Sequence, residues 1–239
     1  MTGINGVGGS QEIVGRTAYA AEKTTSPGLA GSAPNGEVRE IREVPRVEVA
    51  SSVQSAPTPT AIWTERLDPI RVYYANTEDE ISIRLYSADG SVDPNALASF
   101  RSIVAAKGAE PAPMHPRLVQ LVMKAAYHFG AHSVVVVSAY RPSRSRSAGK
   151  HATGEAIDFK LKGVSSKKIA SYVRHFPRAG VGIYTHPDTQ YVHLDVREES
   201  FHWLDASPPG KHAHEKKLND PTREERDLAY TPESDLPLD

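Results

Sequence analysis

Two histidines and one aspartate form the most informative pattern of this sequence. His151 and Asp158 lie seven residues apart in the segment KHATGEAIDF, and His193 follows 35 residues after Asp158 in YVHLD. Two imidazoles and one carboxylate are a ligand set suited to Zn²⁺, and three protein ligands leave one position open for water. An open position is typical of a catalytic rather than a structural zinc. The pattern therefore predicts a hydrolase that binds one zinc ion per chain.

The residues around these ligands support that interpretation. Asp158 lies in the apolar run AIDF, where a carboxylate is costly unless it is paired or bound to a metal. In a strand, His193 and Asp195 share one face, while the apolar residues on either side of His193 pack on the other. Gly154 allows the backbone to bend between the first two ligands. A polar pair of His193 and Asp195 on a solvent-facing strand is the simpler alternative, but it leaves the first two residues of the pattern unexplained.

Composition limits the classes of protein to be considered. The chain has 239 residues, which is enough for one domain with tails. A formal net charge of −1 gives no overall field that would attract nucleic acid. The lack of cysteine excludes disulfides, thiolate zinc sites and cysteine nucleophiles. No apolar run approaches the roughly 20 residues of a membrane span. The N-terminus shows no charged region followed by an apolar one, so we expect either a cytosolic protein or a leader that this chain does not include.

The composition divides the chain into three segments. Residues 1–62 are rich in Gly, Ser, Ala, Thr and Pro and are expected to be a disordered linker. Residues 63–205 are expected to fold as the domain. Residues 206–239 are charged and contain prolines, which predicts a disordered tail with at most a short helix near 223–228.

Periodicity within the domain predicts strands and helices that do not alternate regularly. The expected strands are 70–74, 81–86, 134–137, 156–161, 180–184 and 191–196, and the expected helices begin near Pro94, Pro116 and Ser165 or Ser166. The last two strands would form a hairpin around 186–189. This arrangement predicts an α+β fold with a small, mainly antiparallel sheet and flanking helices.

Five motifs in a fixed order resemble a known family. They are SAYRP at 138–142, HxxGxAxD at 151–158, GVGxY at 180–184, VHxD at 192–195 and Trp203. In order and spacing they are similar to the YcbK-like branch of the zinc D-Ala-D-Ala metallopeptidases, over roughly residues 70–203. The resemblance implies a fold like that of the hedgehog and D-Ala-D-Ala peptidase domains. It also implies zinc ligands at His151, Asp158 and His193, with Arg141 facing the substrate and Tyr184 contributing to its binding.

The activity implied by the resemblance is hydrolysis of an amide bond in or between peptidoglycan stem peptides, by an endopeptidase or a carboxypeptidase. Such a substrate would place the protein in the periplasm or at the cell surface. Arg141 would stabilise the developing oxyanion, the alternative being a surface arginine that follows a strand. Arg144 and Arg146 lie in a basic loop that would bind the free carboxylates of stem peptides, the alternative being a solvated loop.

The general base is absent from the positions where many relatives carry it. Two and three residues before the last zinc ligand, this sequence has Tyr191 and Gln190. Asp195 is the nearby carboxylate that could act as the base, or it could instead orient the ligand imidazole. Three functions therefore stay open. The first is a zinc peptidase of peptidoglycan. The second is a catalytically silent zinc-containing module that binds the cell wall or a partner, since the hedgehog signalling domain resembles peptidases without being an established one. The third is a peptidase that acts on other small D-amino-acid peptides.

Overall fold

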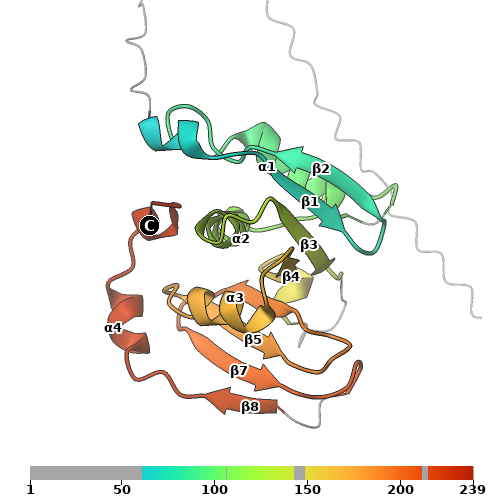
Figure 1. The fold of residues 1–239 in the computed structure, drawn as a ribbon, viewed down its shortest axis with the longest axis vertical. Coiled ribbons are helices and arrows are strands. Elements are labelled where there is room, and N and C mark those ends of the chain that lie inside the picture. The colour runs from blue at the N-terminus through green and yellow to red at the C-terminus, as the bar shows by residue number, and fades with distance from the viewer. Residues whose placement is uncertain (1–60, 106, 143–148, 212–214, 239) are drawn as a thin grey trace, which may run out of the picture. The chain divides into compact units, whose positions relative to one another are not determined.

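The computed structural model describes residues 61–105, 107–142, 149–211 and 215–238. In these residues the chain forms an eight-stranded sheet with the order β2-β1-β3-β4-β6-β5-β7-β8 (Figure 1). The strands are β1 (Ile70–Tyr74), β2 (Asp79–Ile83), β3 (Ser133–Ser138), β4 (Ala156–Leu161), β5 (Ala179–Tyr184), β6 (Val192–Val196), β7 (Phe201–Asp205) and β8 (Glu215–Leu218). The β1–β3 and β5–β7 pairings are parallel, and the other five are antiparallel.

Helices and short 3-10 segments complete the described part of the chain. The helices are α1 (Pro94–Ile103), α2 (Pro116–His128), α3 (Ser166–Val173) and α4 (Arg223–Leu228), and the 3-10 segments are η1 (Ile62–Arg66), η2 (Lys150–Thr153) and η3 (Pro232–Asp235). The carboxylate of Asp93 caps α1 by accepting a hydrogen bond of 2.7 Å from the backbone N–H of Asn95. The hydroxyl of Ser165 caps α3 in the same way. These side chains satisfy N–H groups that have no partner within the helix, which explains why the helices begin there.

The core lies between the sheet and α1, α2 and α3. In β4, Ile157 and Phe159 are fully buried toward this core, and strand alternation places Asp158 on the opposite face. In β6, Leu194 faces the core, while His193 lies on the same face as Asp158. The helices therefore seal one face of the sheet and leave the polar residues of β4 and β6 on the other.

The α+β prediction is confirmed, but the sheet is mixed and larger than the small antiparallel sheet that we expected. The two strands not predicted are β7 and β8. β8 reads EKKL, and its three charged residues are exposed at the edge of the sheet, so it carries no apolar alternation to detect. Lysines on an edge strand oppose pairing with another chain. β7 lies parallel to β5 across a connection that includes β6, and local periodicity does not reveal such a pairing.

The described residues between 206 and 238 are folded, in contrast to the predicted disordered tail. Arg117 of α2 donates hydrogen bonds of 2.8 and 3.1 Å to the two carboxylate oxygens of Asp235, which is 3% exposed. Asp227 of α4 accepts hydrogen bonds of 2.7 and 2.6 Å from the backbone N–H and the hydroxyl of Ser200. Buried polar contacts rather than an apolar stripe hold this segment on the domain. The composition of this segment predicted disorder, and that prediction is wrong for the residues that the structure describes. The short helix expected near 223–228 is present as α4.

Some predictions concern residues that the structure does not describe. The proposed linker lies outside the described residues except for Ala61 and Ile62. The loop arginines Arg144 and Arg146 also lie outside them. Among the helices of the described ranges, none is long and apolar enough to cross a membrane.

Candidate metal centre and active site

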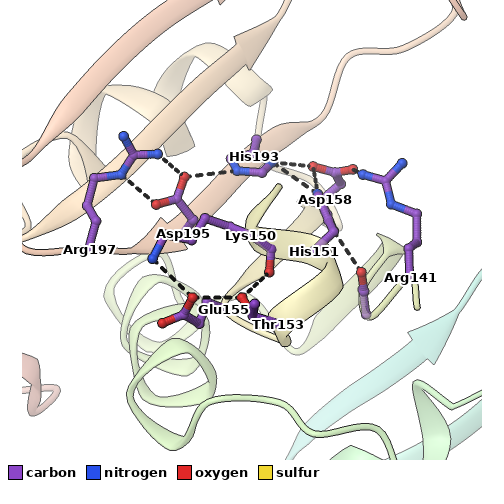
Figure 2. A network of polar contacts seen from close by, with 10 residues as sticks. Arg141, Lys150, His151, Thr153, Glu155, Asp158, His193, Asp195 and Arg197 are labelled. Atoms are coloured by element: carbon purple, nitrogen blue, oxygen red, sulfur yellow. Dashed lines mark hydrogen bonds and ion pairs between the residues drawn. The ribbon is translucent and has the colours of Figure 1, made fainter. Parts of the chain in front are cut away.

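The three predicted metal ligands lie together on the face of the sheet that the helices leave open (Figure 2). His151 belongs to η2, Asp158 to β4 and His193 to β6. His193 Nδ1 is 2.8 Å from Asp158 Oδ1, and His151 Nε2 is 3.4 Å from the same oxygen and 3.3 Å from His193 Nδ1. The three donor atoms lie within 4.8 Å of one another, and all three residues are buried. This group could hold a metal ion.

Strand register and one glycine bring the three residues together. β4 and β6 are antiparallel with Asp158 directly opposite His193, so their side chains project side by side. Gly154 follows η2 with φ of +75°, and a Cβ there would collide with the carbonyl of Pro113. Only glycine fits this turn, because it needs both the left-handed backbone and the empty space. The turn holds His151 over the start of β4.

Hydrogen bonds on the outer ring nitrogens fix both imidazoles. His151 Nδ1 donates to the carbonyl of Ala139 over 2.7 Å, and His193 Nε2 lies 3.1 Å from Asp195 Oδ2. With protons on these outer nitrogens, His151 Nε2 and His193 Nδ1 present their lone pairs to the centre of the group. Metal-binding histidines typically have such a partner on the second nitrogen.

Asp195 is held from the other side by Arg197, as Figure 2 shows. Arg197 Nε donates to Asp195 Oδ1 over 2.6 Å, and Arg197 Nη2 donates to Oδ2. Asp195 is 1% exposed and lies on the opposite side of the His193 ring from Asp158. Gly180 of β5 makes room for this pair, because a Cβ there would collide with the carboxylate and the guanidinium. Arg197 is not among the site residues predicted from the sequence, although its place two residues after Asp195 was the available signal.

Electrostatics in the group favour a cation at its centre. Burial alone would raise the pKa of Asp158, but hydrogen bonds to His151 and His193 hold that pKa well below its usual range. Burial alone would lower the pKa of His193, but hydrogen bonds to Asp158 and Asp195 raise it to about 9. The site thus stabilises positive charge between two carboxylates, and a divalent cation would compete with the proton for His193 Nδ1.

A cleft of about 480 Å³ opens over the three ligands. Its aromatic wall consists of Tyr184, Tyr191 and Trp203. The rings of Tyr184 and Tyr191 stack with centroids 4.3 Å apart, and the ring of Trp203 lies 5.0 Å from that of His193. Gly182 permits the second contact, because a Cβ there would lie 2.5 Å from Trp203 Cζ2. The two glycines of GVGxY therefore leave room for side chains that line the cleft.

The other predicted site residues occupy different parts of this cleft. Arg141 lines it with a side chain that is 62% exposed, and its Nη2 is 4.0 Å from Asp158 Oδ2. Tyr184 also lines it, and burial followed by the charge of Asp158 raises the pKa of its hydroxyl to about 12. Burial likewise raises the pKa of Tyr191, whereas Gln190 is exposed and does not line the cleft.

Comparison with known proteins identifies the family. A family model described as peptidoglycan L,D-endopeptidase MepK matches residues 64–203, which is more than half of the 239-residue chain. A search of curated proteins and a search of solved structures each found no match. The matched segment includes the metal-ligand group and most of the cleft. The chain therefore belongs to this family, the metallopeptidases that act on peptidoglycan.

Proposed function

We propose that this chain is a zinc-dependent peptidase that hydrolyses an L,D amide bond in or between peptidoglycan stem peptides. The observation that carries the proposal is the buried group of His151, Asp158 and His193 beneath an open cleft. The description of the matched family supports an L,D-endopeptidase over a carboxypeptidase. Since peptidoglycan lies outside the cytoplasmic membrane, we place the protein in the periplasm or at the cell surface.

The three donor atoms fit zinc in number and in type, and hydrogen bonds already orient them. His151 Nε2, His193 Nδ1 and Asp158 Oδ1 would hold the ion and leave a position for water or substrate. The outer nitrogens are already occupied by Ala139 and Asp195, so the donor atoms need little reorganisation. When bound, zinc makes water nucleophilic near neutral pH and polarises a carbonyl.

Three side chains of the cleft are suited to the substrate. Arg141 reaches the cleft beside Asp158, where its guanidinium can donate to the oxygen that becomes negative during hydrolysis. A single well-placed donor of this kind contributes about 3 kcal/mol to the transition state. Tyr184 and Tyr191 keep their hydroxyl protons at physiological pH, because their pKa values are raised. They can therefore donate hydrogen bonds to a peptide but cannot act as bases.

We assign Asp195 to the orientation of His193 rather than to proton abstraction. Oδ2 contacts His193 Nε2, on the side of the ring away from the proposed metal, and both oxygens accept from Arg197. A general base must reach the proton that it abstracts within about 3 Å or through one water. Asp195 lines the cleft, but its oxygens are engaged by the His193 imidazole and the Arg197 guanidinium.

Zinc stoichiometry in purified protein tests the ligand assignment. Elemental analysis is expected to give one zinc per chain in the wild type and a loss of zinc in His151→Ala and His193→Ala. His186→Ala is the matched control, because His186 lies on the β5–β6 loop outside the cleft and is expected to keep the metal. Full zinc in His193→Ala would contradict the assignment. Stoichiometric zinc without hydrolysis of any peptidoglycan would favour the catalytically silent binding module.

A further inference from the structure

A third carboxylate lines the cleft and forms no ion pair with any residue that the structure describes. Asp205, the last residue of β7, lines the cleft and is 2% exposed. Its Oδ1 accepts a hydrogen bond of 2.7 Å from the backbone N–H of Ser207. Among the described residues, none donates a hydrogen bond to Oδ2 or forms an ion pair with it. A buried carboxylate with an unpaired oxygen is costly unless a ligand or water satisfies it.

The remaining charged side chains near Asp205 do not fill this role. Besides the pairs that the two histidines form with Asp158 and Asp195, the described residues that line the cleft form the ion pairs Arg141–Asp158, Arg197–Asp195 and Lys150–Glu155. Lys211 also lines the cleft, but it is exposed and forms no ion pair with Asp205 in the described part of the chain. Within the described part of the chain, Asp205 is therefore a cleft carboxylate that stays available to a cation from outside.

The aromatic wall lies on the same face as Asp205. Tyr184 is opposite Asp205 in the parallel register of β5 and β7, and Trp203 precedes Asp205 by two residues in β7. Side chains at such positions project from one face of a sheet. A carboxylate next to aromatic rings is a suitable environment for an ammonium group, through charge-assisted hydrogen bonds and cation–π contact.

We propose that Asp205 binds an ammonium group of the peptide substrate, either a free α-amine or the side-chain amine of a diamino acid. The proposal rests on the peptidase function and adds a requirement about the substrate. Residue 205 lies just beyond the segment matched by the family model, which ends at 203.

The sheet sets the distance between this subsite and the reacting bond. His193 is level with Trp203 across β5, and Asp205 lies two residues farther along β7. The two residues are separated by two inter-strand spacings across the sheet and by two residues along the strand direction. These distances place the Cα atoms of His193 and Asp205 roughly 12 Å apart. This corresponds to about three or four residues of extended peptide. The recognised amine therefore belongs to a residue within about four positions of the bond that is cut.

Selective acetylation of the substrate tests the proposal. Three forms of one cross-linked stem peptide are compared: unmodified, acetylated on the α-amine, and acetylated on the side-chain amine. With wild-type protein, acetylation of the recognised amine is expected to lower kcat/KM on the order of tenfold to a hundredfold through KM, as for the loss of a charged hydrogen bond. The identity of the sensitive position separates the two sources of ammonium.

The variant Asp205→Asn links the effect to the carboxylate. Asparagine keeps an acceptor for Ser207, so the turn after β7 is preserved, and melting temperature and zinc content check the fold. In this variant the same acetylation is expected to change kcat/KM by less than about threefold. A change of that size is comparable to the usual deviation from additivity between independent substitutions. Asp188→Asn, a substitution of an exposed aspartate on the β5–β6 loop, is the control and should keep the full sensitivity.

A binding measurement separates this proposal from the peptidase function. Calorimetry on zinc-free protein with an uncleavable analogue should show the same dependence on the free amine and on Asp205. Insensitivity of the wild type to both acetylations, or an equal loss in wild type and Asp205→Asn, would overturn the subsite. Amine-dependent binding without hydrolysis would uphold the subsite and contradict the peptidase function.

Discussion

Substitution of Asp195 by asparagine should weaken zinc binding while leaving the fold intact. The carboxylate accepts from His193 Nε2 over 3.1 Å and from two nitrogens of Arg197. An asparagine has one acceptor oxygen, so its NH2 group must face either the imidazole N–H or the guanidinium. Loss of such a partner of a metal-bound histidine typically costs 10-fold to 100-fold in metal affinity, or about 1.4 to 2.7 kcal/mol.

Arg197 provides a second arm of the same experiment. Arg197→Met leaves Asp195 in place but removes the donors that hold it, so zinc affinity should fall by a smaller factor, about threefold to tenfold. If Arg197 acts through Asp195, the double variant should bind zinc no more weakly than Asp195→Asn alone, because residues in one network are not additive. Arg71→Met is the control, since Arg71 forms an exposed ion pair with Glu80 on β1 and β2.

Competition with a chromophoric chelator measures the zinc dissociation constants of these variants, and thermal unfolding of the zinc-free proteins checks their stability. Hydrolysis is measured in parallel at saturating zinc. Unchanged zinc affinity in Asp195→Asn with a large loss of kcat would refute the orienting role and identify Asp195 as the base. Additive losses in the double variant would show that Arg197 does not act through Asp195.

Three other properties can be tested separately. Arg141→Ala should lower kcat about 100-fold with full zinc content, and unchanged kcat would remove Arg141 from the reaction. Asp235→Asn removes the anionic partner of the partly buried Arg117 and should lower the free energy of unfolding in urea by about 3 kcal/mol without changing zinc affinity. Burial and then Arg174 lower the pKa of His202 to about 4, below its unfolded value, so the folded state binds fewer protons. Stability should fall as the pH drops from about 6.5 to 4, by at most about 3 kcal/mol, and the fall should be smaller in His202→Gln.

The sequence predicted the metal-ligand residues because their surroundings are unusual at the level of single strands. A carboxylate within AIDF and a histidine within VHL are costly unless they share a partner, and this local conflict is visible without a structure. Alternation in two strands that the periodicity also predicted puts both side chains on the polar face of the sheet. The antiparallel pairing of β4 and β6 then places Asp158 opposite His193. The local pattern and the tertiary arrangement therefore agree at these positions.

Other features depend on contacts between distant segments and had no local signal. The hold of Arg117 on Asp235 joins residues 118 positions apart, and it orders a segment whose composition predicted disorder. The collisions that require glycine at positions 180 and 182 involve side chains of neighbouring strands, so they appear only when the sheet is assembled. Asp205 carries no sequence signal beyond ending the predicted domain, because its position in the cleft depends on the parallel pairing of β5 and β7.

Mass spectrometry of muropeptides after digestion of purified cross-linked peptidoglycan tests the central claim most directly. Zinc-loaded wild-type protein should release soluble peptides cut at an L,D amide bond, each cut adding one water. Zinc-free protein and His193→Ala should release none, and addition of zinc should restore activity only to the wild type. Equal release by His193→Ala, or no release by wild-type protein that carries one zinc per chain, would contradict the claim.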